Sequence, residues 1–235
     1  MALGINCEAI VLWRRKHKLY SVITFLTRQK GIIRCSVPHK RLQGMRSTGY
    51  LQPFSAVVIT IVQDGEYFNL QQIDGRYLIR SIETDLNSIC YAAFAGELIS
   101  RLFPLEEVDH SLFNLVYRFS QLARTKPVPL AVILLGWQLL SKAGFVPAAS
   151  DYAKANGLAR FLSEFTGSTG LTFSKEAQRA LGDILFYNWS AEHSIELTRP
   201  LWLELERNLF AYATMQLGEE LSSLTFLHTM KAKAL

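Results

Sequence analysis

The sequence predicts an α+β protein in which a five-stranded β-barrel over residues 1–80 precedes an all-α domain over residues 81–235. Two changes near residue 80 support this division: the hydrophobic period shifts from two to 3.6, and the net charge changes sign. A chain of 235 residues can bury a core without disulfide staples. Its 49% hydrophobic and 19% charged content excludes an intrinsically disordered chain.

Alternating apolar and polar residues predict the strands. Ile33, Cys35 and Val37 alternate with polar neighbours, as expected of a half-buried strand. The β-branched run over residues 56–62 suits a strand covered on both faces. The predicted strands are residues 5–13, 18–28, 31–37, 55–63 and 66–73, with turn residues at Gly31 and Asp64-Gly65. Five short strands indicate a small closed or partly open barrel, with the basic connection from Pro38 to Tyr50 outside it.

Apolar residues four apart predict helices beyond residue 84. Cys90, Phe94, Leu98 and Leu102 form one such row. Other rows are Leu112, Leu115, Phe119 and Leu122, and later Trp202, Leu205, Leu209 and Tyr212. The boundary signals are N-caps at Asp85 and Ser111, the Lys126–Pro129 break, Gly144 after a helix over 130–143, and helix starts near Ser174 and at Pro200. Residues 148–172 have weak periodicity and three glycines, so we expect a loop with one short helix there.

The charge is concentrated in the first 80 residues. They hold twelve Lys and Arg against four Asp and Glu, a net +8, whereas the remaining 155 residues hold 13 basic and 16 acidic residues, a net −3. A basic module joined to a mildly acidic one favours a polyanionic partner, and nucleic acid is the commonest. A solvated, solubilising face is the alternative.

The candidate DNA-binding residues are basic side chains with aromatic rings between them. The predicted phosphate-binding residues are Arg14, Arg15, Lys16 and Lys18 on the first hairpin, with Arg34, Lys40, Arg41 and Arg46. Trp13, Tyr20 and Tyr50 are candidates for base stacking, because single-strand binders combine a positive groove with aromatic platforms. Trp13 and Tyr20 could equally belong to the barrel core. Without base readout, binding should be sequence-independent and sensitive to salt.

Catalytic signatures are absent from the sequence. It contains no P-loop, GxGxxG, GxSxG or HExxH motif. Asp109-His110 and Glu192-His193 are carboxylate and histidine neighbours, but adjacent side chains point apart in helices and strands. We therefore expect no enzymatic activity, and a hydrolase using one of these pairs is a remote alternative.

Cysteine usage and the N-terminus indicate a cytoplasmic protein. Cys7, Cys35 and Cys90 are widely spaced and form no CxxC pair, so we expect buried apolar residues and neither a disulfide framework nor a thiolate metal site. The N-terminus lacks the order of a secretory signal. The longest apolar run, residues 128–140, is too short to span a membrane.

Several segments together resemble the RecO family of recombination mediators. In the first domain they are Glu8-Ala-Ile-Val-Leu12, Thr24-Phe-Leu-Thr-Arg-x-x-Gly31, the basic loop from Pro38-His-Lys-Arg41 to Arg46, and Leu51-Gln-Pro-Phe54. In the second they are Leu140-x-x-x-Gly144-Phe-x-Pro147 and Glu204-Leu-Glu-Arg207 running to Gly218-x-x-Leu-x-Ser-Leu-x-Phe-Leu227. Order and spacing carry the resemblance, which spans nearly the whole chain.

This resemblance implies an OB-fold barrel, a helical domain and a non-enzymatic role in DNA repair and homologous recombination. It implies binding of single- and double-stranded DNA, annealing of complementary strands, and contacts with RecR and with the acidic tail of single-strand-binding protein. It further implies help in loading RecA onto DNA coated with that protein. An adaptor that captures partners and binds DNA only weakly is the alternative.

Two departures from the family pattern affect these expectations. Many members carry a four-cysteine zinc site after the Gly-x-x-Pro segment, but residues 147–174 contain no cysteine, so we expect no zinc and no other cofactor. The family's Gly-Glu-x-Asp ahead of the second strand is replaced by Arg15-Lys16-His17, which makes this edge more basic.

Overall fold

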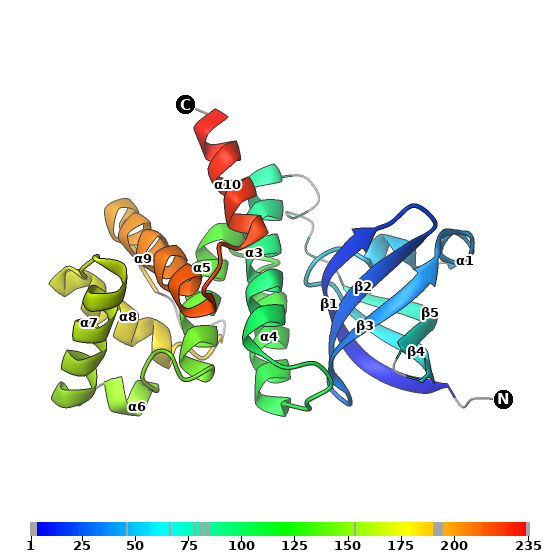
Figure 1. The fold of residues 1–235 in the computed structure, drawn as a ribbon, viewed down its shortest axis with the longest axis horizontal. Coiled ribbons are helices and arrows are strands. Elements are labelled where there is room, and N and C mark those ends of the chain that lie inside the picture. Colours follow the sequence, from blue (N-terminus) through cyan, green and yellow to red (C-terminus); the bar gives the residue numbers. More distant parts are fainter. Residues whose placement is uncertain are drawn as a thin grey trace.

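The protein folds as a closed β-barrel followed by a helical region, as the sequence predicts (Figure 1). This is a computed structural model, and it describes residues 4–45, 47–65, 67–77, 79, 82, 85–152, 154–189 and 195–233. The strands and the short helical turns between them are β1 (Ile5–Lys16), β2 (Tyr20–Thr27), β3 (Gly31–Pro38), α1 (His39–Gln43), η1 (Thr48–Tyr50), β4 (Ala56–Asp64) and β5 (Tyr67–Tyr77).

The strand order around the barrel is β1-β2-β3-β5-β4, and β4 pairs with β1 to close it. The β3–β5 pair is parallel and the other pairs are antiparallel. This five-stranded arrangement confirms the OB-fold barrel. Leu42 of α1 and Leu51 after η1 join the interior core, so the segment between β3 and β4 covers one end of the barrel.

Three strand ends differ from the predicted ranges. β1 continues to Lys16 instead of ending at Trp13, and β5 continues to Tyr77 instead of ending at Ile73. β2 begins at Tyr20, which leaves Lys18 in the turn. The basic end of β1 lacks apolar alternation, but its backbone is held by pairing with β2. Backbone pairing therefore extends the first hairpin further than the hydrophobic pattern indicates.

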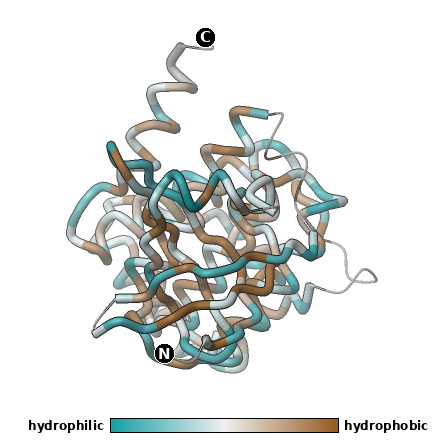
Figure 2. Tube along the Cα trace, turned by 90° about the vertical axis from the view of Figure 1, so that its right-hand side faces the viewer, coloured by the Kyte–Doolittle hydropathy of each residue, from teal (hydrophilic) through white to brown (hydrophobic). Residues whose placement is uncertain are grey.

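The two faces of the barrel strands belong to different cores. Phe25, Ile33 and Cys35 point into the barrel with its other interior residues. Ile10 and Leu26, on the opposite face of β1 and β2, are buried in the core of the helical region. Because strand side chains alternate, one set fills the barrel interior and the other set packs against the helices. Figure 2 shows the hydrophobic stretches of the strands inside the molecule and hydrophilic residues at the turns.

The helical region packs around one buried helix. Its helices are α3 (Leu86–Leu102), α4 (His110–Leu122), α5 (Val128–Lys142), α6 (Ala149–Tyr152), α7 (Ala155–Thr169), α8 (Lys175–Phe186), α9 (Arg199–Leu217) and α10 (Ser222–Lys233). Residues 131–140 of α5 are all buried, which explains why every residue of this segment except Gln138 is apolar. Among the described residues, no helix combines the length and the hydrophobicity needed to cross a membrane.

Helix α3 joins the two parts of the molecule by a close backbone approach. A β-carbon on Gly96 would lie 2.7 Å from the carbonyl oxygen of Leu12 in β1. The connection after α3 then runs beside β3, where Leu105 bridges to Ile32 and the Glu106 amide donates to the Ile32 carbonyl at 2.9 Å. These contacts fix the barrel against the helices (Figure 1).

Of the two predicted N-caps, Asp85 is confirmed and Ser111 is not, and the helix start predicted near Ser174 is also confirmed. Asp85 caps α3 by accepting from the amides of Asn87 and Ser88, and Ser174 caps α8. The prediction of Ser111 as an N-cap is wrong. Asp109 caps α4 by accepting from the Leu112 amide at 2.8 Å, and the Ser111 hydroxyl also donates to Asp109. A carboxylate satisfies the free amides of the first turn while complementing the helix dipole.

The loop expected over residues 148–172 is also wrong. The short helix α6 and the fifteen-residue α7 occupy most of it. Leu158, Phe161, Leu162 and Phe165 carry the helical spacing that the three glycines obscure. Gly157 allows α7 to approach α6, since a β-carbon there would lie 2.2 Å from the Asp151 carbonyl oxygen, and Gly170 ends the helix with a φ of +70°. The predicted helix from Pro200 is confirmed as α9.

Candidate nucleic-acid interface

The register of the first hairpin divides the predicted basic residues between two faces of the barrel. Arg14 pairs with Ile23, and Lys16 with Ser21, so both lie on rows that continue into the barrel interior. Arg15 pairs with Val22, which lies on the outer face. Lys18 is exposed in the turn, and Arg46 lies outside the described residues. The basic cluster in the sequence therefore becomes two separate sites.

The outer face carries a line of exposed cations. Across the sheet, the row that begins at Arg15 continues through Val22 and Ser36 to Asn69. One row away, Arg34 of β3 is exposed and pairs with Thr24 of β2. Beyond β3, exposed Arg41 of α1 donates a hydrogen bond to the side chain of Gln71 in β5. No ion pair of Arg15, Arg34 or Lys40 with another described residue occurs, so their charges are available to a ligand.

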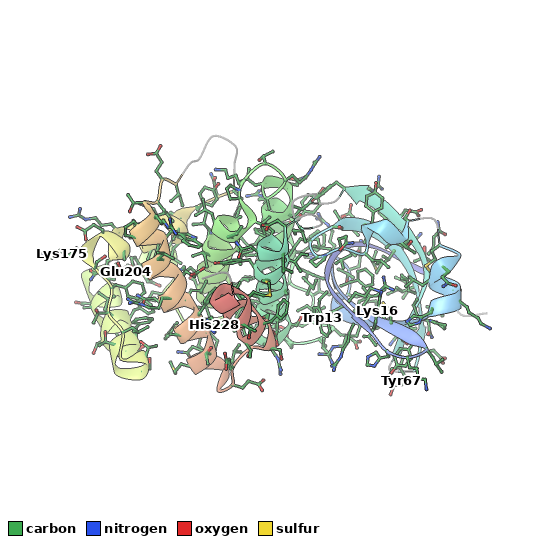
Figure 3. The ribbon with its side chains drawn as sticks, turned by 90° about the horizontal axis from the view of Figure 1, so that it is seen from above. Trp13, Lys16, Tyr67, Lys175, Glu204 and His228 are labelled. Carbon is green, nitrogen blue, oxygen red and sulfur yellow. The ribbon has the colours of Figure 1, made fainter. Side chains whose placement is uncertain are left out.

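An exposed tyrosine that the sequence analysis missed lies next to this line. Tyr67 opens β5, and its side chain is 74% exposed (Figure 3). The parallel register that pairs Cys35 with Phe68 places Tyr67 level with Arg34. Its position two residues after Gly65 of the Asp64-Gly65 turn was the available signal, because a ring at a hairpin turn has little core to enter. We call Arg15, Arg34, Arg41 and Tyr67 the outer-face track.

The three aromatic residues proposed for base stacking have different environments. The Trp13 indole packs against the helical core and donates to Ser100 Oγ of α3 at 3.1 Å, so it serves the contact between barrel and helices. The Tyr50 ring covers Gly75, where a β-carbon would lie 2.2 Å from it. Tyr20 is 40% exposed, and its ring stacks on that of His17 with centroids 4.7 Å apart. Tyr20 and Tyr67 are therefore the rings open to a ligand.

The second site is a recess of about 300 Å³ at the end of the barrel that α1 and η1 cover. We call it the mouth recess, and its lining residues are Arg14, Lys16, His39, Leu42, Gln43 and Thr48. Figure 3 shows Lys16 nearer to the end that carries α1, whereas Trp13 faces the helices. Arg14 donates from Nε and Nη2 to Ser21 Oγ at 3.3 and 3.2 Å, and burial lowers the pKa of its guanidinium.

None of the described carboxylates of the barrel lines the mouth recess. Glu8 is paired with Arg28 at 2.6 Å, and Asp74 accepts from Gln72 at 2.9 Å. Asp64 pairs with Tyr67 at one end of the outer-face track. Arg15, Arg34 and Arg41 thus supply this surface with three cations of the kind that bind phosphates.

A larger cavity of about 530 Å³ lies in the helical region, between α4, α5 and α8. Its apolar wall includes Leu115, Leu185 and Trp189. Exposed Arg118 lines it, as does Lys142, whose Nζ lies 2.8 Å from Asp109 Oδ2. The lining of this cavity thus combines apolar side chains with polar and cationic ones.

The groups considered for catalysis or metal binding have structural roles where they are described. Asp109 caps α4 and pairs with Lys142, while Glu192 and His193 lie outside the described residues. Cys7, Cys35 and Cys90 are buried free thiols, and burial raises the pKa of Cys35 to about 12. Within the described ranges, no three His, Cys, Asp or Glu residues are grouped to hold a metal ion. The zinc site of many RecO members has no cysteine ligands here, and the absence of zinc stays a prediction.

Comparison with known proteins agrees with this architecture. The family model described as Recombination protein O N terminal matches residues 1–78, and the one described as Recombination protein O C terminal matches residues 83–225. A protein named DNA repair protein RecO from Symbiobacterium thermophilum is 24% identical over 248 residues, covering 97% of this chain and 98% of the relative.

A second relative supports the same assignment over part of the chain. It is named DNA repair protein RecO, from Alkaliphilus metalliredigens, and is 24% identical over 136 residues, covering 57% of this chain and 55% of the relative. The two family models together span the barrel and nearly all of the helical region. The chain therefore belongs to the RecO family of DNA repair proteins.

Proposed function

We propose that this protein is a non-enzymatic recombination mediator that binds single- and double-stranded DNA through the outer-face track. The observation that carries the proposal is the alignment of Arg15, Arg34 and Arg41 with exposed Tyr67 on one face of an OB-fold barrel. Arginines contact phosphates without reading sequence, and an exposed ring stacks on any base. This face combines the two contacts that single-strand binders use.

In this proposal annealing requires no nucleophile, metal or nucleotide. Two complementary strands repel each other through their phosphates, and a cationic face lowers that repulsion by replacing condensed counterions. Bases stacked on exposed rings remain turned outward, where a second strand can pair with them. The protein then lowers the barrier to strand encounter without forming a covalent intermediate.

The partners in this role are RecR, single-strand-binding protein and, through them, RecA. We propose that the protein and RecR together help load RecA onto single-stranded DNA coated with single-strand-binding protein. The site of this work is the cytoplasm, on the nucleoid during repair. Family membership supports this role, and the chemistry of the outer-face track agrees with it.

The test is annealing of two complementary oligonucleotides coated with cognate single-strand-binding protein, without added nucleotide or metal. We expect acceleration that fades as salt rises, and a strong loss in the double variant Arg15→Glu, Arg34→Glu. Arg160→Glu is the matched control, because Arg160 is an exposed cation on α7, far along the chain from the barrel. Unchanged annealing in the double variant would contradict the proposed surface.

The second candidate function is a docking adaptor whose main role is partner capture. The cavity between α4, α5 and α8 favours it, because apolar residues and Arg118 can hold the acidic, hydrophobic tail of single-strand-binding protein. Charge reversal at Arg41 and Arg46 separates the two functions. DNA affinity falls if the barrel binds DNA, whereas RecR affinity is the main loss if the barrel is a docking surface.

Tail binding has its own test. Arg118→Glu should weaken binding of a peptide with the sequence of the cognate tail and leave affinity for naked DNA unchanged. Calorimetry with the peptide and anisotropy with a labelled oligonucleotide measure the two affinities. A loss of DNA affinity with no loss of peptide affinity would contradict the tail site.

A further inference from the structure

We propose that the mouth recess binds a phosphomonoester, either the terminal phosphate of a DNA strand or a mononucleotide, as an anion site separate from the outer-face track. The proposal builds on the proposed DNA binding, but its own claim concerns a chemically different phosphate. Internal phosphates of a strand would follow the track, while a chain end would enter the recess.

The shape of the site is the first argument. The recess lies where the rows of Arg14 and Lys16 leave the barrel interior and meet α1 and η1. Its volume of about 300 Å³ is at the small end of ligand pockets, a size that suits a phosphate with its attached sugar. A terminal phosphate can enter such a recess. An internal phosphodiester could enter only if the recess also held the nucleotides on both sides of it.

The charge of the lining is the second argument. Arg14 and Lys16 are basic side chains, and no carboxylate is among the described residues that line the recess. Arg14 is partly withdrawn from water, and its Nε and Nη2 contact only the neutral hydroxyl of Ser21 among their described partners. Burying a cation without a counter-charge is costly, so an anion entering the recess would relieve this cost.

The hydrogen-bonding groups of the lining are the third argument. His39 Nε2 is shielded from solvent and has no hydrogen-bond partner in the part of the chain that the structure describes. Thr48 and Gln43 add a hydroxyl and an amide to the same lining. Guanidinium, ammonium, imidazole and hydroxyl groups are the donors that phosphate oxygens accept from.

The number of charges distinguishes the monoester from the internal diester. A phosphomonoester carries about −1.5 to −2 near neutral pH, whereas a phosphodiester carries a single negative charge. Arg14 and Lys16 together match the monoester. The additional oxygen of the terminal phosphate offers an acceptor to His39 Nε2, which has no hydrogen-bond partner among the described residues.

The experiment compares two single strands of about 12 nucleotides that differ only in a 5′-phosphate or a 5′-hydroxyl, both labelled at the 3′ end. Anisotropy titrations with the full-length protein should show about tenfold tighter binding of the phosphorylated strand. Lys16→Gln and His39→Asn should each bring this ratio close to one. Lys16 is exposed, so its variant tests the recess even if the histidine variant folds poorly.

Arg34→Gln is the matched control, because it removes a cation from the outer-face track and leaves the recess intact. It should weaken both strands equally and preserve the tenfold ratio. Equal affinities of the two strands for the wild-type protein, or a ratio that survives in both recess variants, would overturn the proposal. The proposed function would still stand in either case, because both strands would bind.

A second arm identifies the source of the phosphate. Thymidine 5′-monophosphate is titrated calorimetrically into the protein, with thymidine as the control. Binding of the monophosphate in the micromolar range, lost in Lys16→Gln, supports a mononucleotide ligand, and a preference seen only with the phosphorylated strand assigns the recess to a strand end. If neither strand binds, the proposed function fails. The calorimetric titration then tests the recess by itself, and the absence of heat with the monophosphate would overturn the proposed phosphate site.

Discussion

Gly31 at the start of β3 lies against the backbone of Glu107, such that a β-carbon on Gly31 would sit 2.0 Å from the Glu107 carbonyl oxygen. The φ of Gly31 is +64°, which L residues adopt only with strain. This contact belongs to the α3–α4 connection that runs beside β3. One glycine thus serves both the β2–β3 turn and the junction of the two domains.

Gly31→Ala should therefore destabilise the fold more than the turn conformation alone explains. Gly65→Ala is the matched control, because Gly65 has a φ of +62° but nothing within 4 Å of a β-carbon. The control should lose about 1 to 2 kcal/mol of unfolding free energy from the left-handed backbone. The clash should add about 1 to 3 kcal/mol in Gly31→Ala, measured by urea denaturation. Equal losses in the two variants would contradict the close contact.

Trp13 and Ser100 should couple energetically across the two domains. Trp13→Phe keeps a ring in the core but removes the donor to Ser100 Oγ, and Ser100→Ala removes the acceptor. A double-mutant cycle of unfolding free energies should give a coupling of about 0.5 to 1.5 kcal/mol. Additive effects would show that the hydrogen bond contributes nothing to domain contact.

Tyr67 should contribute to affinity for single strands and little to stability. Tyr67→Ala should lose about 1 to 3 kcal/mol of binding free energy, because the ring can no longer stack on a base. Tyr67→Phe keeps the π face and should bind like the wild type. Because the side chain is 74% exposed, thermal unfolding should be nearly unchanged in both. Anisotropy titrations test this, and wild-type affinity in the alanine variant would remove Tyr67 from the track.

The salt dependence of DNA binding reports how many phosphates the protein contacts. About five contacts give a slope of log affinity against log salt of roughly −3.5 on single strands, from about −0.7 per contact. Arg34→Gln should reduce the steepness by about 0.7. Titrations over a salt series measure both slopes, and a wild-type slope near zero is incompatible with a phosphate-binding surface.

Asp109 should make the helical region sensitive to acid. Burial raises the pKa of this carboxyl, but hydrogen bonds from Lys142, the Leu112 amide and Ser111 outweigh burial and lower it to about 2. A pKa lowered on folding stabilises the native state above the unfolded value near 4, and this stabilisation disappears as pH falls toward 2.

Asp109→Asn tests this, since asparagine can still cap α4 but carries no charge. After allowance for solvent screening, the charge should contribute about 1 kcal/mol at neutral pH. Urea denaturation at several pH values should show a smaller loss between pH 4 and pH 2 in the variant than in the wild type. If the unfolding free energies of the two proteins change equally with pH, the charge of Asp109 contributes nothing measurable to stability.

The sequence alone determined the order of the elements and the division into barrel and helices. Alternation such as Ile33, Cys35 and Val37 requires a strand with one buried face, and the spacing of Phe94 and Leu98 requires a helix. These patterns reflect burial along one element, which is local information. They failed at the ends of β1, β2 and β5, where glycines masked the periodicity of α7, and where Asp109 rather than Ser111 caps α4.

The candidate sites were decided by tertiary structure. Arg14 and Arg15 are adjacent in the sequence, but strand geometry sends one toward the mouth recess and the other to the outer-face track. Trp13 donates a hydrogen bond to Ser100 of α3. The parallel β3–β5 pair places Tyr67 level with Arg34. Such contacts join residues far apart in the chain. Periodicity records which side of an element is buried, but only the fold decides which element covers it.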